Sequence, residues 1–362
     1  MYWKRTLLFI LSAIMLIAVT GCKINIDIDV KATPEPGFSL IKASDITDDF
    51  NSFKLDWKTG GLLYSLYSGD AKNNIVQIRR SESGKVRIEQ YAKMGFKDES
   101  AFSADVEDGV LIIKDARASS IYDETQHPSF FIMYLPEKLF RNVDIELANC
   151  TFSGLDLKAG DISFKLGSGS AVLKGEFKNE LVDIATGALV IENSAEESEN
   201  VKLYMASGSF TSTFKKADII DAKILTGDLN MKGDAKDVKF DLAAGAIDYK
   251  GSAGNMKMDV ASGKVTSVGS VSGALNVGLI SGAVSITSST MIVSADATVT
   301  AGNLQLSLPR NNSGFKVYVD RAAGTFSSGF ATTKTDNEYL FGDGGVKITL
   351  KLISGSIKIS PV

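Results

Sequence analysis

Four aspartates come nearest to a catalytic arrangement in this sequence. Asp218 and Asp221 lie close together, and Asp234 and Asp237 repeat that spacing about one repeat unit later. Carboxylates paired on one outer face can cleave glycosidic bonds, and an aspartate cluster can hold calcium. Lysines are interspersed with these aspartates: Lys215, Lys216, Lys223 and Lys236. A solvated, charge-balanced edge is therefore the preferred interpretation, and a carboxylate site for acidic polysaccharides is the alternative.

Few other residues in the sequence could take part in catalysis. His127 is the only histidine and lies in the polar stretch DETQHPS, which is typical of a loop. A lone histidine leaves little basis for a Ser-His-Asp triad or a multi-histidine zinc site. Cys150 lies in the apolar segment LANCTF, which favours a buried small side chain over a reactive thiol. We therefore predict no enzyme activity, no metal and no cofactor.

Two further segments favour structural roles. The acidic run at residues 196–199 indicates a solvated loop. Tyr204, Phe210 and Phe214 lie close together, and their spacing favours core packing over a platform for sugars. The glycines of the chain lack the Gly-Lys-Ser/Thr ending of a phosphate-binding loop.

The N-terminal residues predict export and lipid attachment. Positive residues at positions 4–5 precede an apolar run over residues 6–19, which has the length of a signal-peptide core and is short for a membrane-spanning helix. The run ends in the pattern of a lipobox, formed by Val19, Thr20, Gly21 and Cys22. We predict a signal segment over residues 1–22, cleaved before Cys22, and a lipid on that cysteine. An ordinary secretory signal with a chance cysteine is the alternative.

The predicted lipid would hold the chain at the outer side of a bacterial membrane, since each buried methylene adds roughly 0.8 kcal/mol of membrane affinity. Residues 23–37 are expected to form a tether, stiffened by its Pro-Glu-Pro segment. The net charge is −4 with both signs interspersed, and no basic patch indicates nucleic-acid binding. The predicted partners are therefore the membrane and envelope glycans or proteins.

A glycine repeat dominates the second half of the sequence. Ten glycines, each preceded by Ser, Thr or Ala, recur mostly 18 to 21 residues apart. The positions two residues after and five residues before each glycine are always apolar, and the position three residues before is apolar except at Arg321. This alternation predicts two short strands meeting at a corner. The corner glycines are Gly169, Gly187, Gly208, Gly227, Gly245, Gly263, Gly282, Gly302, Gly324 and Gly355.

The apolar alternation shifts by one residue across each glycine. A strand cannot absorb such a shift without a kink, and glycine can adopt the conformation required. We expect the small residue before the glycine to point inward at this corner. A second glycine follows six residues later in four units and indicates the next corner: Gly175, Gly233, Gly251 and Gly269.

A unit of about 19 residues cannot bury both its faces, but stacked units can. The predicted fold is all-β, a parallel β-helix or β-roll solenoid with rungs about 4.8 Å apart. An antiparallel sandwich is the alternative. Residues 38–150 are expected to form a less regular N-terminal β region with early rungs and a cap, and residues 151–362 the regular repeats. Residues 357–361 would close the stack, with Lys358 and Pro361 discouraging end-to-end addition.

Three segments resemble a bacterial "putative adhesin" family of β-helix lipoproteins, a domain of unknown function. One is Leu135-Pro136 within FIMYLPEKLFRNVDIEL. The second is Leu308-Pro309, followed by FKVYVDRAAGTFSS, and the third is the closing GDGGVKITLKLISGSIKIS. The resemblance covers roughly residues 38–362. It implies an exported or membrane-attached β-helix and brings no catalytic residues.

Three functions are compatible with these features. The first is a lipid-anchored cell-envelope protein whose rigid body acts as an adhesin, binding module or scaffold. The second is a polysaccharide lyase or hydrolase that uses outward carboxylates, which loss of activity in Asp218→Ala or Asp234→Ala would reveal. The third is an accessory or regulatory protein of the envelope-stress response. A groove lined with carboxylates or aromatics on the outer surface would favour an enzyme or a glycan-binding role, and a uniformly mixed polar surface would favour a scaffold.

Overall fold

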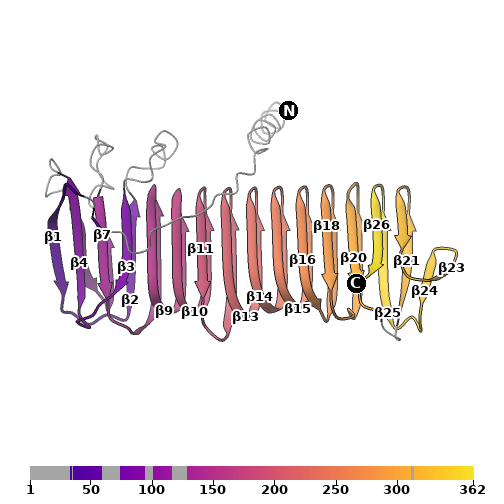
Figure 1. The fold of residues 1–362 in the computed structure, drawn as a ribbon, viewed down its shortest axis with the longest axis horizontal. Helices are drawn as coiled ribbons and strands as arrows, with labels where there is room; N and C mark the ends of the chain where they lie inside the picture. Colours follow the sequence, from indigo (N-terminus) through magenta and orange to yellow (C-terminus); the bar gives the residue numbers. More distant parts are fainter. Residues whose placement is uncertain (1–32, 35, 59–73, 94–100, 116–128, 311–313) are drawn as a thin grey trace, which may run out of the picture.

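The computed structural model describes residues 33–34, 36–58, 74–93, 101–115, 129–310 and 314–362, and the regular elements among them are all β-strands. The strands stack into one elongated body (Figure 1). This confirms the predicted solenoid with rungs of about 19 residues. The antiparallel-sandwich alternative is wrong, because the rungs of the stack pair in parallel.

The strands fall into four groups along the chain. The N-terminal strands are β1 (Phe38–Ile46), β2 (Ser52–Lys58), β3 (Ile75–Arg80), β4 (Val86–Lys93), β5 (Ser103–Glu107), β6 (Val110–Lys114), β7 (Ser129–Leu135) and β8 (Leu139–Ala148). Five long strands are β9 (Cys150–Leu166), β10 (Gly169–Ile184), β13 (Ser209–Ile224), β14 (Asp228–Leu242) and β15 (Ala246–Val260). Shorter strands complete the regular rungs: β11 (Ala188–Asn193), β12 (Ser198–Met205), β16 (Lys264–Val271), β17 (Ala274–Leu279), β18 (Ala283–Ser288), β19 (Ser294–Val299) and β20 (Asn303–Leu308). The C-terminal strands are β21 (Phe315–Arg321), β22 (Thr325–Ser328), β23 (Thr333–Thr335), β24 (Glu338–Phe341), β25 (Val346–Leu352) and β26 (Ser356–Pro361).

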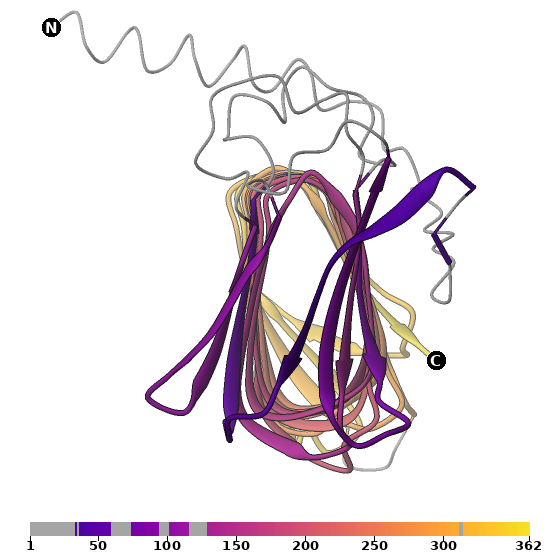
Figure 2. The same cartoon turned by 90° about the vertical axis from the view of Figure 1, so that its left-hand side faces the viewer.

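Each rung contributes to two facing walls, which converge at one edge when viewed along the stack (Figure 2). In β10, residues 170–175 pair with β11, and residues 179–184 pair with β12. We call the wall that contains β11 the first wall and the wall that contains β12 the second wall. A long strand such as β10 therefore bends between the walls, and a corner glycine returns the chain to the first wall.

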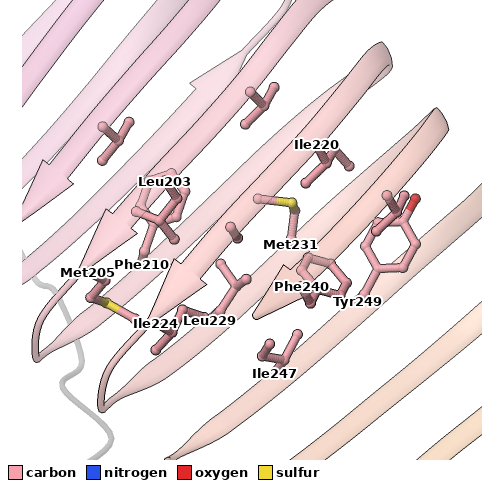
Figure 3. Close-up of a cluster of buried hydrophobic side chains, with 14 of the residues drawn as sticks. Leu203, Met205, Phe210, Ile220, Ile224, Leu229, Met231, Phe240, Ile247 and Tyr249 are labelled. Carbon is pink, nitrogen blue, oxygen red and sulfur yellow. The ribbon is translucent and has the colours of Figure 1, made fainter. Parts of the chain in front are cut away.

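Inward side chains form ladders between the walls. Leu229, Ile247, Val265 and Val284 are successive register partners, and none is more than 2% exposed. Figure 3 shows this packing, in which Leu229 and Ile247 of the first wall lie near Phe240 of the second. The buried residues form one continuous hydrophobic core along the stack. Burial of this apolar surface is the main source of stability.

The corner glycines stack directly on one another. Gly245 has a φ of +109°, and a Cβ built on it would lie 2.0 Å from the carbonyl oxygen of Gly227 in the preceding rung. The same contact joins Gly227 to Gly208 and Gly263 to Gly245. Both the backbone conformation and the close approach therefore require glycine at this corner.

The residue before the corner glycine lies outside the core, so the expectation that it points inward was wrong. Thr186, Ser262 and Ala301 are exposed. The Thr186 hydroxyl donates to the carbonyl of Gly167 at 3.0 Å, and its backbone N–H donates to the same group at 2.9 Å. The polar backbone groups of the corner form hydrogen bonds along the stack, and the short side chain remains on the outer surface.

The C-terminal rungs do not stack in chain order. β25 pairs with β19 on one side and with β21 on the other, while β26 lies between β20 and β22. Figure 1 shows β26 between β20 and β21. Residues 357–361 therefore do not end the stack, contrary to the sequence expectation. That end carries the antiparallel strands β23 and β24.

The N-terminal end is built in a similar way. β2 lies between β6 and β8, and β3 lies between β7 and β9, all in parallel pairing. Antiparallel strands cover the outer rung, with β5 on β6 and β4 on β7. The rung of β2 and β3 is thus covered by strands from later in the sequence, and the rung of β25 and β26 is covered by β21 and β22 from earlier in the sequence.

Candidate functional site

An exposed apolar surface lies along the edge of the second wall, where its strands end and bend toward the corner glycines. The position two residues before the corner glycine is occupied in five successive rungs by Ala206, Leu225, Ala243, Ala261 and Ile280, which backbone hydrogen bonds hold in register. Leu225 is 61% exposed and Ile280 is 59% exposed. We call these five residues, together with Tyr204, the wall patch. Contiguous apolar surface of this kind marks contact sites.

The wall patch lines a shallow hollow of 730 Å³. Ala243, Ala261 and Gly278 have short side chains or none, so the surface is low between the two projecting residues Leu225 and Ile280. The hollow results from the order of large and small residues along one outward column. It can accept a projecting side chain from another molecule.

Charged pairs border the wall patch. Asp241 lies 2.8 Å from the amine of Lys239, and Asp259 lies 3.0 Å from that of Lys257. The Lys223 amine lies over the ring of Tyr204, 5.3 Å from its centroid. The border therefore presents both charge signs, and Asp241 and Asp259 each have a cation from their own rung.

Tyr204 belongs to this outer surface, and the prediction that it packs in the core was wrong. It is 41% exposed, whereas Phe210 and Phe214 are buried as expected. Leu203 and Met205 point inward from β12, so Tyr204 between them must face outward. The sequence prediction failed because it grouped the three aromatics without fixing the alternation of each strand.

The four candidate aspartates lie on the second wall and the bend that leads to it. Asp218 is 2.6 Å from the amine of Lys236, and Asp221 is 3.9 Å from that of Lys239. Asp234 accepts a hydrogen bond from the Ser252 backbone N–H at 2.7 Å. Asp237 accepts one from the Asn255 amide at 2.8 Å.

The geometry does not bring the four aspartates together. Asp234 and Asp237 line one hollow of 410 Å³, Asp221 and Asp237 line another of 280 Å³, and Asp218 lines neither. Within the part of the chain that the structure describes, no group of three or more His, Cys, Asp and Glu could hold a metal ion. The pattern of contacts matches a charge-balanced edge.

The remaining candidate residues form surface ion pairs, lie in the core or fall outside the described residues. The exposed acidic run pairs with lysines of the next rung, Glu196 with Lys215, and Glu197 with Lys216 at 2.6 Å. Cys150 is buried, as predicted. His127 and the lipobox at residues 19–22 lie outside the described residues.

A buried carboxylate was not anticipated from the sequence. Glu180 is 1% exposed and lies between Ile162 and Val201 in an inward ladder of the second wall. Its Oε1 accepts a hydrogen bond from the Asn193 amide at 2.6 Å, while Oε2 has no hydrogen-bond partner. Burial raises the pKa of Glu180 to about 7, and the Asn193 hydrogen bond opposes this rise.

Asn193 and Ser198 organise the cluster around Glu180. Asn193 also donates to the carbonyl of Phe177 at 2.8 Å and to the Ser198 hydroxyl at 3.0 Å. These hydrogen bonds fix the bend of this rung. The rung is longer than its neighbours, because part of the acidic run lies between Asn193 and Ser198. Extending the repeat alignment to the position seven residues before the corner glycine would have revealed Glu180 as a charge among apolar residues.

Comparison with known proteins places the chain in a family. The model described as Toastrack DUF4097 matches residues 69–252 and 234–360. The chain belongs to this family. The resemblance to a "putative adhesin" family of unknown function is thereby confirmed. No curated protein matches the chain, and among the described residues no helix is long and apolar enough to cross a membrane.

Several solved structures match most of the chain at low identity and low TM-score. A "putative adhesin" from Parabacteroides distasonis is 12% identical, with 89% of this chain and 96% of that chain covered and a TM-score of 0.36. A "putative lipid binding protein" from the same species is 12% identical, with coverages of 88% and 96% and a TM-score of 0.39. A "putative cell adhesion protein" from Clostridium sporogenes is 13% identical, with coverages of 89% and 99% and a TM-score of 0.25.

Proposed function

We propose that this chain is an exported, lipid-anchored protein of the bacterial cell envelope, and that its rigid body holds another macromolecule against the wall patch without catalysing a reaction. The wall patch is the observation that carries the proposal. Leu225 and Ile280 project from a wall on which other outward positions carry ion pairs. Water contact with such a surface is unfavourable, and a complementary partner relieves it.

The sequence supports the location in the envelope. A lipid on Cys22 would anchor the chain, and residues 23–37 would separate the body from the membrane. A rod on a tether presents its long side to neighbouring molecules. This geometry suits a binding or scaffold role.

The geometry gives the polysaccharide-cleaving alternative no comparable support. Catalysis by a carboxylate pair needs two carboxyl groups on either side of one bond. Asp218 and Asp221 each lie beside a lysine, and Asp237 is held by Asn255. Beside the wall patch, Asp241 and Asp259 are neighbours in adjacent rungs, but each is paired with a lysine of its own rung.

Lipid attachment is tested by Cys22→Ser in the full chain. We expect the variant to lose incorporation of labelled fatty acid and to leave the membrane fraction, because the thiol that receives the lipid is gone. Cys150→Ala is the control and should keep both properties. Fatty-acid labelling that persists in Cys22→Ser would contradict the anchor.

The docking role of the wall patch is tested by Leu225→Asp and Ile280→Asp. Cross-linking on intact cells should give a complex with the unchanged chain and several-fold less of it with either variant, because a carboxylate opposes burial of the patch. Val268→Asp is the matched control, since Val268 is an exposed apolar residue of the first wall. Equal yields from all four chains would remove the support for a docking surface.

A further inference from the structure

We propose that the wall patch docks a second copy of this chain, with the two second walls face to face and the two stacks antiparallel. This inference rests on the proposed docking role and names the partner. Three outward columns of the second wall determine which residues would meet. The columns lie two, four and six residues before the corner glycines.

The symmetry of such a pair fixes which residues meet. A two-fold axis in the plane of the contact, perpendicular to the stack, reverses the order of the rungs and keeps each column opposite itself. A column of five rungs can then pack on its own copy only if its reversed order is complementary to it. The rung that lies on the axis sets the register.

Side-chain size is complementary when the axis passes through the rung of Ala243. Leu225 then faces Ala261 of the second copy, and Ile280 faces Ala206, so each projecting residue meets an alanine. In the next column, Tyr204 faces Gly278, two rungs beyond the axis on the other side. Three large side chains are thus matched with three small residues in one register.

Charge is complementary in the same register. Lys223 faces Asp259 of the second copy, and Asp221 faces Lys257. Each of these two contacts occurs twice in the dimer, once on either side of the axis. The two-fold repetition gives four oppositely charged contacts around the apolar centre.

Like charges meet only on the axis. Asp241 faces its own equivalent there, and so does Lys239, but these two residues are 2.8 Å apart within each chain. The axis therefore brings together two neutralised pairs. Opposite charges in diagonal positions can then interact across the interface.

A shift of half a rung toward Ala261 destroys the match. With the axis between Ala243 and Ala261, Leu225 would face Ile280, so the projecting residues would collide. Asp241 would face Asp259, and Lys239 would face Lys257. With the axis between Leu225 and Ala243, Lys223 would face Asp241, but Lys202 would face Lys257. Of the three registers, only the one centred on Ala243 keeps like charges on the axis.

The contact is small. Five rungs of about 4.8 Å and three alternating positions of about 6.6 Å cover roughly 500 Å² on each copy. The total of roughly 1,000 Å² is at the low end for specific complexes. We therefore expect a reversible dimer, favoured where tethering concentrates the chain on a surface.

The register is tested with single cysteines in the full chain in its native membrane and a thiol cross-linker of about 8 Å. Ala243→Cys should give a dimer, because this position faces itself across roughly 10 Å. Ala261→Cys and Leu225→Cys alone should give at least five-fold less, since each lies two rungs from its equivalent. Coexpression of these two variants with different tags should restore a mixed dimer. Thr266→Cys on the first wall is the control.

The charges are tested by exchange. Asp259→Lys should reduce the Ala243→Cys dimer several-fold by placing a lysine opposite Lys223. Adding Lys223→Asp should restore it, since the two positions lie two rungs apart within one chain and face each other only between copies. Restoration would not follow from a purely structural role of either residue.

Two results would overturn the dimer. One is the absence of a homodimer with Ala243→Cys, and the other is equal cross-linking by Ala261→Cys alone. If Ala243→Cys instead cross-links to a different molecule, the proposed dimer is refuted, but the proposed docking role of the wall patch remains supported. If, in addition, the aspartate variants of the wall patch leave cell-surface complexes unchanged, both proposals fall.

Discussion

Glu180 shows how one side chain makes the stability of the stack depend on pH. Its carboxyl group lies among apolar residues of the second wall, and one oxygen has no hydrogen-bond partner. Burial of the charged form is therefore unfavourable, and the pKa of Glu180 rises to about 7 from an ordinary value of 4.5. The folded chain holds this proton at pH values where the unfolded chain has released it.

The sign of the effect follows from proton binding. Below pH 4.5 both states are protonated and Glu180 adds no pH dependence; between pH 4.5 and 7 the folded state loses stability as the pH rises. Glu180→Gln should therefore raise the free energy of unfolding by about 3 kcal/mol at pH 8 and change it little at pH 4. Urea unfolding at the two pH values measures this difference.

Glu176→Gln is the matched control for this measurement. Glu176 lies on the exposed surface of the same strand and forms an ion pair of 3.1 Å with Lys158. Its replacement should change stability by less than about 1 kcal/mol at either pH. A Glu180→Gln variant that is no more stable than the unchanged chain at pH 8 would contradict the role assigned to burial.

The corner is the element that the repeat specifies most strongly. Most corner glycines adopt a positive φ and lie against the carbonyl of the glycine in the neighbouring rung, as Gly245 does against Gly227. A side chain at this position would meet backbone, which cannot rotate away. The glycine column is thus a requirement of the rung spacing as well as of the local turn.

Gly245→Ala should destabilise the stack through both effects. The added Cβ would lie 2.0 Å from the Gly227 oxygen, so the rungs must separate locally. Gly109→Ala provides the control, because Gly109 also has a positive φ, of +73°, but nothing lies within 4 Å of its Cβ position. We expect Gly245→Ala to cost about 2 kcal/mol more than Gly109→Ala in urea unfolding. Equal costs would show that rung contact plays no part.

The sequence predicted the rungs well because their physical requirements are local. Apolar alternation on both sides of a glycine identifies the two walls, and the ladder of Leu229, Ile247 and Val265 follows from the shared period. The residue before the glycine was wrongly predicted to point inward, because a hydrophobic pattern does not reveal the backbone hydrogen bonds of the corner. No prediction was made for the outward-facing positions of the repeat, although the wall patch lies among them.

At the scale of the whole molecule, the repeat specified the position of a residue within its rung but not the order of the rungs. Gly355 stacks on Gly302, and Gly324 stacks on Gly355. The spacing of 31 residues between Gly324 and Gly355 contains β23 and β24, which carry the chain back toward the body. Any strand with the right alternation fits any rung, so the chain order at the ends depends on these connections.

The wall patch is also a property of the whole stack. Leu225 and Ile280 are unremarkable in their own strands, and only the alanines between them on the stacked wall create the hollow. Exposed apolar residues cannot be recognised from a single strand, because alternation assigns them to the outside without saying what surrounds them. The site therefore required the register of five rungs.

The placement of β25 and β26 has a kinetic consequence. Both are synthesised after β21 and β22, yet they supply the only parallel neighbours that join those strands to β19 and β20 in the described structure. In a chain exported from its N-terminus, the residues from the end of β22 to the end of β26 are the last to emerge. Until they emerge, two sets of strand edges stay open to water, to chaperones and to the edges of other unfinished chains.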